Sequence, residues 1–145
     1  MAERHPCCYI MVLPPQNYIK LNVDGHVPSV GWAGLGVVAR DHRGELVAAA
    51  VKRIHLTQAE IAEAQAVRYA LQLARRLEYS HIWIESDAQE VVHAIKTKSN
   101  GVTPFHLVIE DVKSDSFNFN DCIFSHVRRV YNTVSLQHIC EAYSN

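Results

Sequence analysis

Three carboxylates, on Asp24, Glu63 and Asp87, are the side chains of this sequence best suited to chemistry. Asp24 lies in an alternating run of apolar and polar residues, 19–25, that predicts a strand. Glu63 lies near the start of a predicted helix, and Asp87 directly follows a second β-prone run, 81–86. Acids in such positions can converge at one edge of a sheet, where they repel one another unless a cation lies between them. The pattern therefore predicts a hard divalent metal, Mg²⁺ or Mn²⁺, and with it phosphate chemistry.

Each of these acids also has an ordinary structural role. Asp24 precedes a glycine, and Asp-Gly is a common turn dipeptide. Glu63 suits the first turns of a helix, where the helix dipole favours negative charge. Asp87 begins a D-x-x-E pattern, so it is also a candidate N-cap for a helix over 88–95. For each residue alone the structural role is the more common one, but the three acids together favour a metal site.

Composition and charge narrow the class of protein. The chain has 145 residues, of which 48% are hydrophobic and 20% charged, and this predicts one globular domain. A formal net charge of −1 argues against a protein that coats nucleic acid through electrostatics alone, but not against a nucleic-acid enzyme. No apolar run approaches the roughly 20 residues of a membrane span, so we expect no membrane association. The four cysteines form no C-x-x-C pair, which predicts reduced thiols and a cytoplasmic or nuclear protein.

The elements that must position the acids follow an α/β order: three strands, a long helix, a strand, a short helix, a third helix, a strand and a terminal helix. Residues 31–40 and 45–51 predict the second and third strands, joined by a turn at 41–44, as an antiparallel meander with the first. A capping-box pattern, Thr57-x-x-Glu60, begins the long helix, which we expect to end at Leu77. The glycines of 31–36 do not match G-x-G-x-x-G, so close packing or an edge without side chains explains them better than a dinucleotide site.

Four motifs occur in order along the chain: I-K-L-N-V-D-G, G-x-A-G-x-G-V-V-A-R-D-x-x-G, A-E-A-x-A and I-E-S-D. This series resembles ribonuclease H, and most closely the reverse-transcriptase-like branch that is abundant in plant genomes. The resemblance covers roughly residues 14–134. It implies a ribonuclease H-like α/β fold with a mixed five-stranded sheet flanked by helices. We expect this domain to occupy residues 14–145, after a flexible preface of residues 1–13.

The resemblance also assigns roles to residues. It implies that Asp24, Glu63 and Asp87 hold a two-metal site of Mg²⁺ or Mn²⁺, with one ion weakly held. The family's loop histidine, which assists proton transfer or product release, would be His126; its ordinary role is a structural hydrogen bond at a strand end. In the family the segment that begins with this histidine runs H-V-x-R-x-x-N-x-V-A-D, and we match its arginine, asparagine and valine to Arg128, Asn132 and Val134.

The main departure from the family is at Leu136, which occupies the position of its fourth aspartate and cannot bind a metal. From about residue 135 the tail no longer resembles the family's alanine-rich helix. We attribute this change to an altered reading frame, an alternative splice or a decayed gene copy. Loss of that aspartate should weaken activation of the attacking water more than substrate binding.

The function implied by the resemblance is nucleic-acid binding and metal-dependent hydrolysis of the RNA strand of RNA–DNA hybrids, leaving a 5′-phosphate and a 3′-hydroxyl. The expected partner is an RNA–DNA hybrid, and we expect a monomer. Leu136 leaves two alternatives open: a catalytically inactive nucleic-acid-binding module with the ribonuclease H fold, and an interaction module without nucleic-acid affinity. The three retained carboxylates and His126 favour the enzyme.

Overall fold

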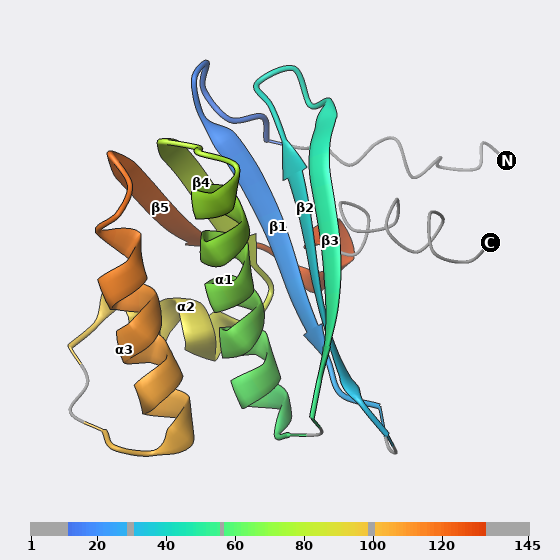
Figure 1. Cartoon of the computed structure of the whole chain (residues 1–145), viewed down its shortest axis with the longest axis vertical. Coiled ribbons are helices and arrows are strands. Elements are labelled where there is room, and N and C mark those ends of the chain that lie inside the picture. Colours follow the sequence, from blue (N-terminus) through green and yellow to red (C-terminus); the bar gives the residue numbers. More distant parts are fainter. Residues whose placement is uncertain (1–11, 29–30, 56, 99–100, 133–145) are drawn as a thin grey trace, which may run out of the picture.

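Five strands form one mixed sheet, in the order β3-β2-β1-β4-β5, in the computed structural model of the chain (Figure 1). The structure describes residues 12–28, 31–55, 57–98 and 101–132. The elements are β1 (Ile19–His26), β2 (Ala33–Arg40), β3 (Leu46–Ile54), α1 (Ala59–Arg76), β4 (His81–Ser86), α2 (Gln89–Lys96), α3 (Pro104–Ser116) and β5 (Asp121–His126). Their order confirms the predicted α/β layout up to β5. Residues 129–132 are helical, and the rest of the predicted terminal helix lies outside the described residues.

The first three strands form the predicted antiparallel meander, since β1 pairs with β2 and β2 with β3. The turn between β2 and β3 is closed by the Asp41 carboxylate, which accepts hydrogen bonds from the backbone N–H groups of Arg43 and Glu45 at 2.9 and 3.0 Å. Gly44 in this turn has a φ of +81°, which favours glycine over any other residue. The meander places β1 at the centre of the sheet, with β4 on its other side.

β1, β4 and β5 run parallel to one another, and helices connect them. Helix α1 leads into β4, and α2 with α3 connects β4 to β5. All three helices cover the same face of the sheet (Figure 1). Because the strands are parallel, the carboxyl ends of β1 and β4 meet at one edge of the sheet, with Val23 beside Ser86 in the register. The residues that follow these two are Asp24 and Asp87.

The core lies between the sheet and the helices, and α1 contributes mostly small side chains to it. The buried residues of α1 are Ala62, Ala64, Ala66, Val67, Ala70, Leu71 and Ala74. They pack against large apolar residues of the strands, among them Leu21, Val37 and Ile84, all nearly inaccessible to solvent. An alanine-rich face lets the helix axis approach the sheet closely. This close approach brings Glu63 of α1 near Asp24 of β1.

The helix starts differ from the sequence-based prediction. The N-cap of α1 is Gln58, without a side-chain hydrogen bond, so the capping box at Thr57 and Glu60 is wrong. The helix ends one residue before Leu77, which is its C-cap. Packing of the alanine face against β1 therefore stabilises this helix start without a capping side chain. No described helix is both long enough and apolar enough to span a membrane.

Candidate metal centre

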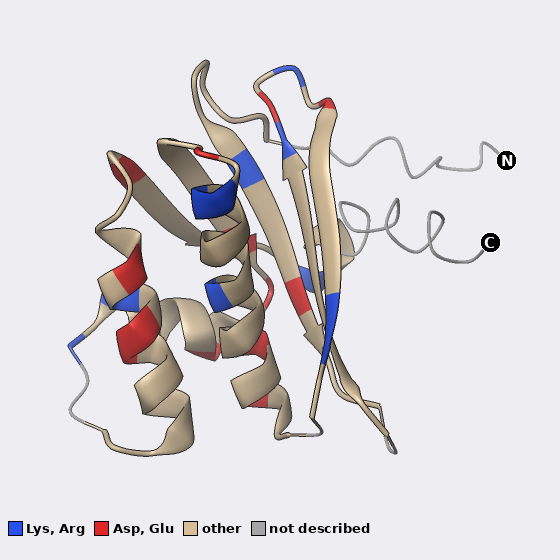
Figure 2. Cartoon of the chain, viewed as in Figure 1, with Lys and Arg blue, Asp and Glu red and all other residues tan. Residues whose placement is uncertain are grey.

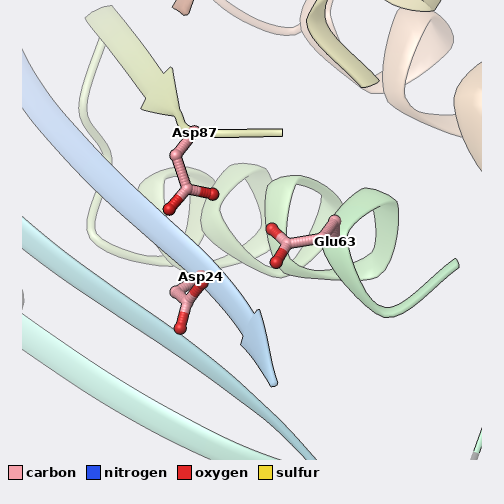
Figure 3. A group of neighbouring side chains, drawn as sticks. All are labelled: Asp24, Glu63 and Asp87. Carbon is pink, nitrogen blue, oxygen red and sulfur yellow. The ribbon is translucent and has the colours of Figure 1, made fainter. Parts of the chain in front are cut away.

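The three predicted carboxylates converge in space. Asp24 near the end of β1, Glu63 in the second turn of α1 and Asp87 just after β4 each offer one carboxylate oxygen, and these oxygens lie within 4.8 Å of one another. Figure 3 shows the three side chains near one another, carried by a strand, a helix and the end of a strand. All three residues are partly buried. Three oxygen donors at this separation form a site of the kind that Mg²⁺ and Mn²⁺ prefer.

Gly25 brings Glu63 to Asp24. A Cβ on Gly25 would lie 2.5 Å from the backbone carbonyl carbon of Ala62, so only glycine lets α1 come this close to β1. The backbone N–H of Gly25 donates a hydrogen bond to the Glu63 carboxylate. Asp24 and Gly25 lie within β1, which continues to His26. The ordinary role of Asp24-Gly25 as a turn is therefore wrong, and the glycine serves helix packing at the site.

Asp87 is not a helix cap. The N-cap of α2 is Ala88, and it makes no side-chain capping hydrogen bond. The backbone N–H of Ala88 instead donates to the hydroxyl of Ser86 at 3.1 Å. The D-x-x-E capping box predicted at Asp87 and Glu90 is therefore wrong, and the Asp87 carboxylate is left to face Asp24 and Glu63.

Without a cation, burial and mutual repulsion destabilise the ionised forms of the three carboxylates. Burial, followed by the negative charges of Asp24 and Asp87, raises the pKa of Glu63 to about 8. Burial and the charge of Asp87 also raise the pKa of Asp24. Oε2 of Glu63 is buried and has no hydrogen-bond partner. A buried carboxylate oxygen without a donor, beside two further carboxylates, fits a divalent metal because such an ion satisfies the oxygen and removes the repulsion.

Two basic side chains, His26 and Arg129, act on Asp24, and neither is among the site residues predicted from the sequence. The charges of His26 and Arg129 lower the pKa of Asp24 and oppose the effects of burial and of Asp87. The arginine at the site is therefore Arg129, which corrects the match of the family's arginine to Arg128. The signal was present in the sequence, because Arg129 precedes Asn132 by three residues, as in the family's R-x-x-N spacing.

His126 lies beside the site but is not part of the carboxylate group. It is the last residue of β5 and pairs with Ser86, the neighbour of Asp87. Its side chain is exposed, and among the residues that the structure describes the only group with metal-ligand spacing is formed by Asp24, Glu63 and Asp87. The proposed role of His126 in proton transfer or product release stays a prediction.

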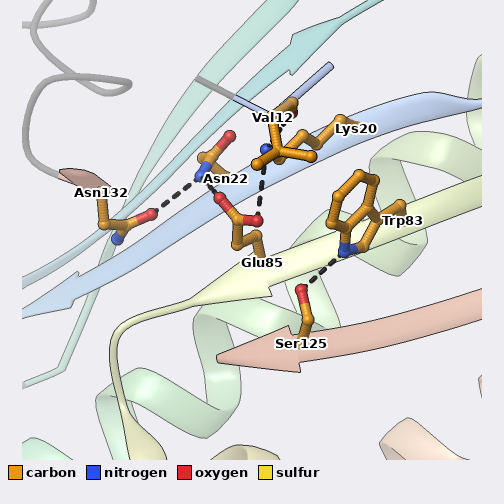
Figure 4. Close-up of polar contacts among 7 residues, drawn as sticks. All are labelled: Val12, Lys20, Asn22, Trp83, Glu85, Ser125 and Asn132. Carbon is orange, nitrogen blue, oxygen red and sulfur yellow. Dashed lines mark hydrogen bonds and ion pairs between the residues drawn. The ribbon is translucent and has the colours of Figure 1, made fainter. Parts of the chain in front are cut away.

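A buried polar network lies on the sheet face opposite the helices (Figure 4). Lys20 Nζ lies 3.2 Å from Oε2 of Glu85, and Nδ2 of Asn22 donates to Oε1 of Glu85 at 3.1 Å. Nδ2 of Asn22 also lies 3.1 Å from Oδ1 of Asn132, which completes the chain. The network holds residues 20 and 22 of β1, and these residues share a face with Asp24.

Neighbouring contacts complete this network. Lys20 Nζ donates to the backbone carbonyl of Val12 at 2.6 Å and lies 4.5 Å from the ring centroid of Trp83. The indole N–H of Trp83 donates to the Ser125 hydroxyl at 2.6 Å. These contacts connect β1, β4 and β5 on one face. Sequence patterns did not indicate them, because they join residues far apart in the chain.

Leu136, the residue that departs from the family pattern, lies outside the described residues. The same holds for most of the preface, residues 1–11, and for the atypical tail. The limits of the domain, the effect of Leu136 and the origin of the tail stay predictions from the sequence.

Comparison with known proteins gives the family and the fold. A family model described as reverse transcriptase-like matches residues 22–137. No curated protein sequence matches this chain. The ribonuclease H1 of the halophilic archaeon Halobacterium salinarum is a similar solved structure, with a TM-score of 0.74 and 23% identity over 79% of this chain and 89% of that one.

Two further solved structures are similar to this chain and contain nucleic acid. LC11-RNase H1 in complex with an RNA/DNA hybrid has a TM-score of 0.70 and 20% identity, over 80% of this chain and 89% of that one. The foamy viral protease-reverse transcriptase, also with an RNA/DNA hybrid, has a TM-score of 0.67 and 14% identity, over 100% of this chain and 23% of that one. At these identities the likeness shows the fold, which confirms the mixed five-stranded sheet of the ribonuclease H type.

Proposed function

The chain belongs to the reverse transcriptase-like family, and on this basis we propose that it binds nucleic acid and hydrolyses the RNA strand of RNA–DNA hybrids with a divalent metal. The observation that carries the proposal is the convergence of Asp24, Glu63 and Asp87 around the buried, unpartnered Oε2 of Glu63. Similar solved structures hold an RNA/DNA hybrid, which supports the choice of substrate.

The three carboxylates would hold the metal, Mg²⁺ or Mn²⁺. When bound, the metal supplies Lewis-acid activation of a phosphodiester and of an attacking water. The protein keeps the carboxylates at a buried edge, where they have few competing hydrogen-bond donors. Gly25 sets their separation by holding α1 against β1.

Other side chains would act on the substrate directly. His126, exposed beside Ser86, would transfer a proton or help product release. Arg129 and His26, whose charges act on Asp24, would attract the phosphate that the carboxylates alone repel. Selection of the RNA strand would come from contacts to 2′-hydroxyl groups, because a hybrid is recognised mainly by its shape and its sugars.

The alternative is a catalytically inactive module that binds hybrids without cutting them. Leu136 favours this alternative, since it replaces the family's fourth aspartate and leaves fewer ligands for a second ion. The near-neutral charge of the chain is compatible with both proposals, because three of its acids would be neutralised by metal.

Cleavage of a labelled RNA–DNA hybrid tests the proposal. The full chain is assayed in Mg²⁺ and in Mn²⁺, beside Asp24→Asn and Leu136→Asp. Asp111→Asn is the matched control, because Asp111 is an exposed acid of α3, away from the carboxylates. We expect cleavage by the wild-type chain and by Asp111→Asn, and none by Asp24→Asn.

The pattern of results separates the two functions. Hybrid binding without cleavage, with cleavage appearing in Leu136→Asp, would establish the inactive binding module. Cleavage that survives Asp24→Asn would overturn the assignment of the carboxylate site. Absence of both binding and cleavage would refute a nucleic-acid function.

A further inference from the structure

A strip of backbone without side chains lies on β2, beside the carboxylates. Gly36 pairs with Asp24 across β1 and β2, and Gly34 pairs with His26. A Cβ on Gly34 would meet no atom within 4 Å, so the space above this residue is open. Gly34 and Gly36 share the face of Asp24, because residues two apart in a strand point the same way. We call residues Gly34 and Gly36 with their two flanking strands the glycine strip.

β3 forms the far border of the glycine strip and places a cation there. Val51 pairs with Gly36, and Arg53 pairs with Gly34. Both side chains are exposed, and strand alternation puts both on the Asp24 face. Lys52, between them, lies on the helix side, with its Nζ 5.7 Å from the ring centroid of Tyr69. Figure 2 shows a basic stretch on β3 and an acidic residue on β1, with β2 between the two strands.

An aromatic pair forms the end of the glycine strip. The rings of Trp32 and His55 have centroids 5.4 Å apart and planes inclined by 35°. Trp32 is 53% exposed, an unusual state for the largest apolar side chain, whereas the next residue, Ala33, is fully buried on the helix side. Trp32 therefore lies on the same face as the glycines. It is four residues from Gly36, about 13 Å at the rise of a strand.

We propose that the glycine strip binds an unpaired nucleotide of the strand that passes through the carboxylate site. The base stacks on Trp32, His55 supports the indole from its other side, and Arg53 and His26 contact the phosphates. Aromatic rings with interleaved cations are the usual binding surface for single strands. The open space above Gly34 lets a sugar–phosphate backbone approach β2 closely at this residue. The identity of the strand as RNA rests on the proposed function.

Binding of hybrids with single-stranded extensions tests this proposal. Affinities are measured in the Asp24→Asn background, so that no strand is cut, for a blunt RNA–DNA hybrid and for hybrids whose RNA strand is extended at the 5′ or the 3′ end. We expect one extension to tighten binding by about 5- to 150-fold, the range for stacking one base on an aromatic side chain. Trp32→Leu should remove this preference, whereas Trp32→Phe should retain it.

Two matched controls test whether the effects on binding are specific to residues of the glycine strip. Phe117 is an 87% exposed aromatic at the end of α3, so Phe117→Leu should leave the preference intact. Arg53→Ala should weaken binding of the extended hybrid and lower its salt dependence, whereas Arg76→Ala, at an exposed cation on α1, should not.

Equal affinity for all three hybrids, or a preference that survives Trp32→Leu, would overturn the proposal while leaving hybrid cleavage untouched. If no hybrid binds at all, the proposed function fails, and the same variants are tested on a single-stranded RNA oligonucleotide. Binding of that oligonucleotide that is lost in Trp32→Leu would still support the glycine strip. No binding, or binding unaffected by Trp32→Leu, would refute it.

Discussion

The side-chain amide of Asn132 donates a hydrogen bond to the backbone carbonyl of Val23 at 2.8 Å, and Asn132 is fully buried. Its carbonyl oxygen accepts from Asn22, two residues before Asp24. At the other end of the same segment, the backbone N–H of Val127 donates to the carbonyl of Ser86 at 2.9 Å. Residues 127–132 are therefore fixed at both ends to the residues that precede two carboxylates. This segment carries Arg129, whose charge acts on Asp24.

Replacing Asn132 with alanine should affect the site more than the fold. Loss of buried hydrogen bonds costs about 1–3 kcal/mol of unfolding free energy. A displaced Arg129 should lower the rate of hybrid cleavage by up to about 100-fold, because small misplacements of groups that act on the substrate are costly. Both quantities are measured on the same preparations, by urea unfolding and by single-turnover cleavage.

Asn118→Ala is the control for Asn132→Ala. Asn118 is exposed, and its amide donates to the backbone carbonyl of Asp115 at 3.1 Å, away from the carboxylates. Neither the free energy of unfolding nor the rate of hybrid cleavage should change appreciably in this variant. If Asn132→Ala lowers cleavage only in proportion to the fraction of unfolded protein, Asn132 has no positioning role.

The sequence was sufficient to predict the order of the strands and the convergence of the three acids. Alternation with a period of two marked β1, and the apolar run before Asp87 gave the bounds of β4 without error. The order of motifs placed Asp24 and Asp87 near the ends of two strands, so these two acids converge through the parallel pairing of β1 and β4, whereas Glu63 joins them from α1. The fold could be predicted because the local strand and helix patterns agree with the topology of the sheet.

Sequence patterns did not predict the polar contacts around the site. Lys20 and Asn22 have the polar side chains expected on a solvated face, yet they are 3% and 2% exposed. Their burial depends on partners supplied by β4 and by the segment after β5, more than 60 residues away. The helix starts were mispredicted for a related reason. Packing at Gly25 stabilises the start of α1, and no capping side chain is used.

Gly25→Ala should destabilise the protein and separate two carboxylates. The new Cβ would lie 2.5 Å from backbone atoms of Ala62, and relief of the overlap requires α1 to move away from β1. Overpacking of this kind costs about 1–3 kcal/mol. Glu63 would move with the helix, so Mn²⁺ affinity measured by calorimetry should fall as well.

Gly34→Ala is the matched control for Gly25→Ala. Its Cβ would meet no atom within 4 Å, and its backbone is an ordinary strand, so stability should be unchanged or slightly improved. Equal losses of stability in the two variants would show that the approach of α1 to β1 is not what requires glycine at position 25.

Lys20→Met should be among the most destabilising single substitutions in the sheet. Lys20 and Glu85 form an ion pair with side chains 3% and 9% exposed. Removing one partner of a buried pair leaves an uncompensated charge, at a cost of about 3–5 kcal/mol. The double variant Lys20→Met/Glu85→Gln should recover part of this loss in urea unfolding, because the buried negative charge is removed.

Arg43→Met tests whether any lysine or arginine in an ion pair would behave in the same way. Arg43 lies 4.0 Å from Asp41, with 66% of its side chain exposed, and such surface pairs contribute about 0–1 kcal/mol. A loss in Lys20→Met no larger than that in Arg43→Met would contradict a structural role for the Lys20–Glu85 pair.

The stability of the metal-free protein should fall as the pH rises toward 8. Glu63 has a pKa raised from 4.5 to about 8, by burial and by the charges of Asp24 and Asp87. Between these values the folded protein binds more protons than the unfolded chain, so the stabilisation is complete below about pH 4.5 and is lost as the pH passes 8. The raised pKa of Asp24 adds to this loss in the same direction.

Urea unfolding in EDTA across this pH window measures the effect. Glu63→Gln should reduce the slope of stability against pH, whereas Glu110→Gln, at an exposed acid of α3, should leave it unchanged. Added Mg²⁺ should stabilise the protein more near pH 8 than near pH 6, because the ion binds the ionised carboxylates and competes with the proton on Glu63. A slope that is the same in wild type and Glu63→Gln would show that Glu63 ionises normally in the folded protein, and the carboxylate cluster would then not be under the repulsion that a metal relieves.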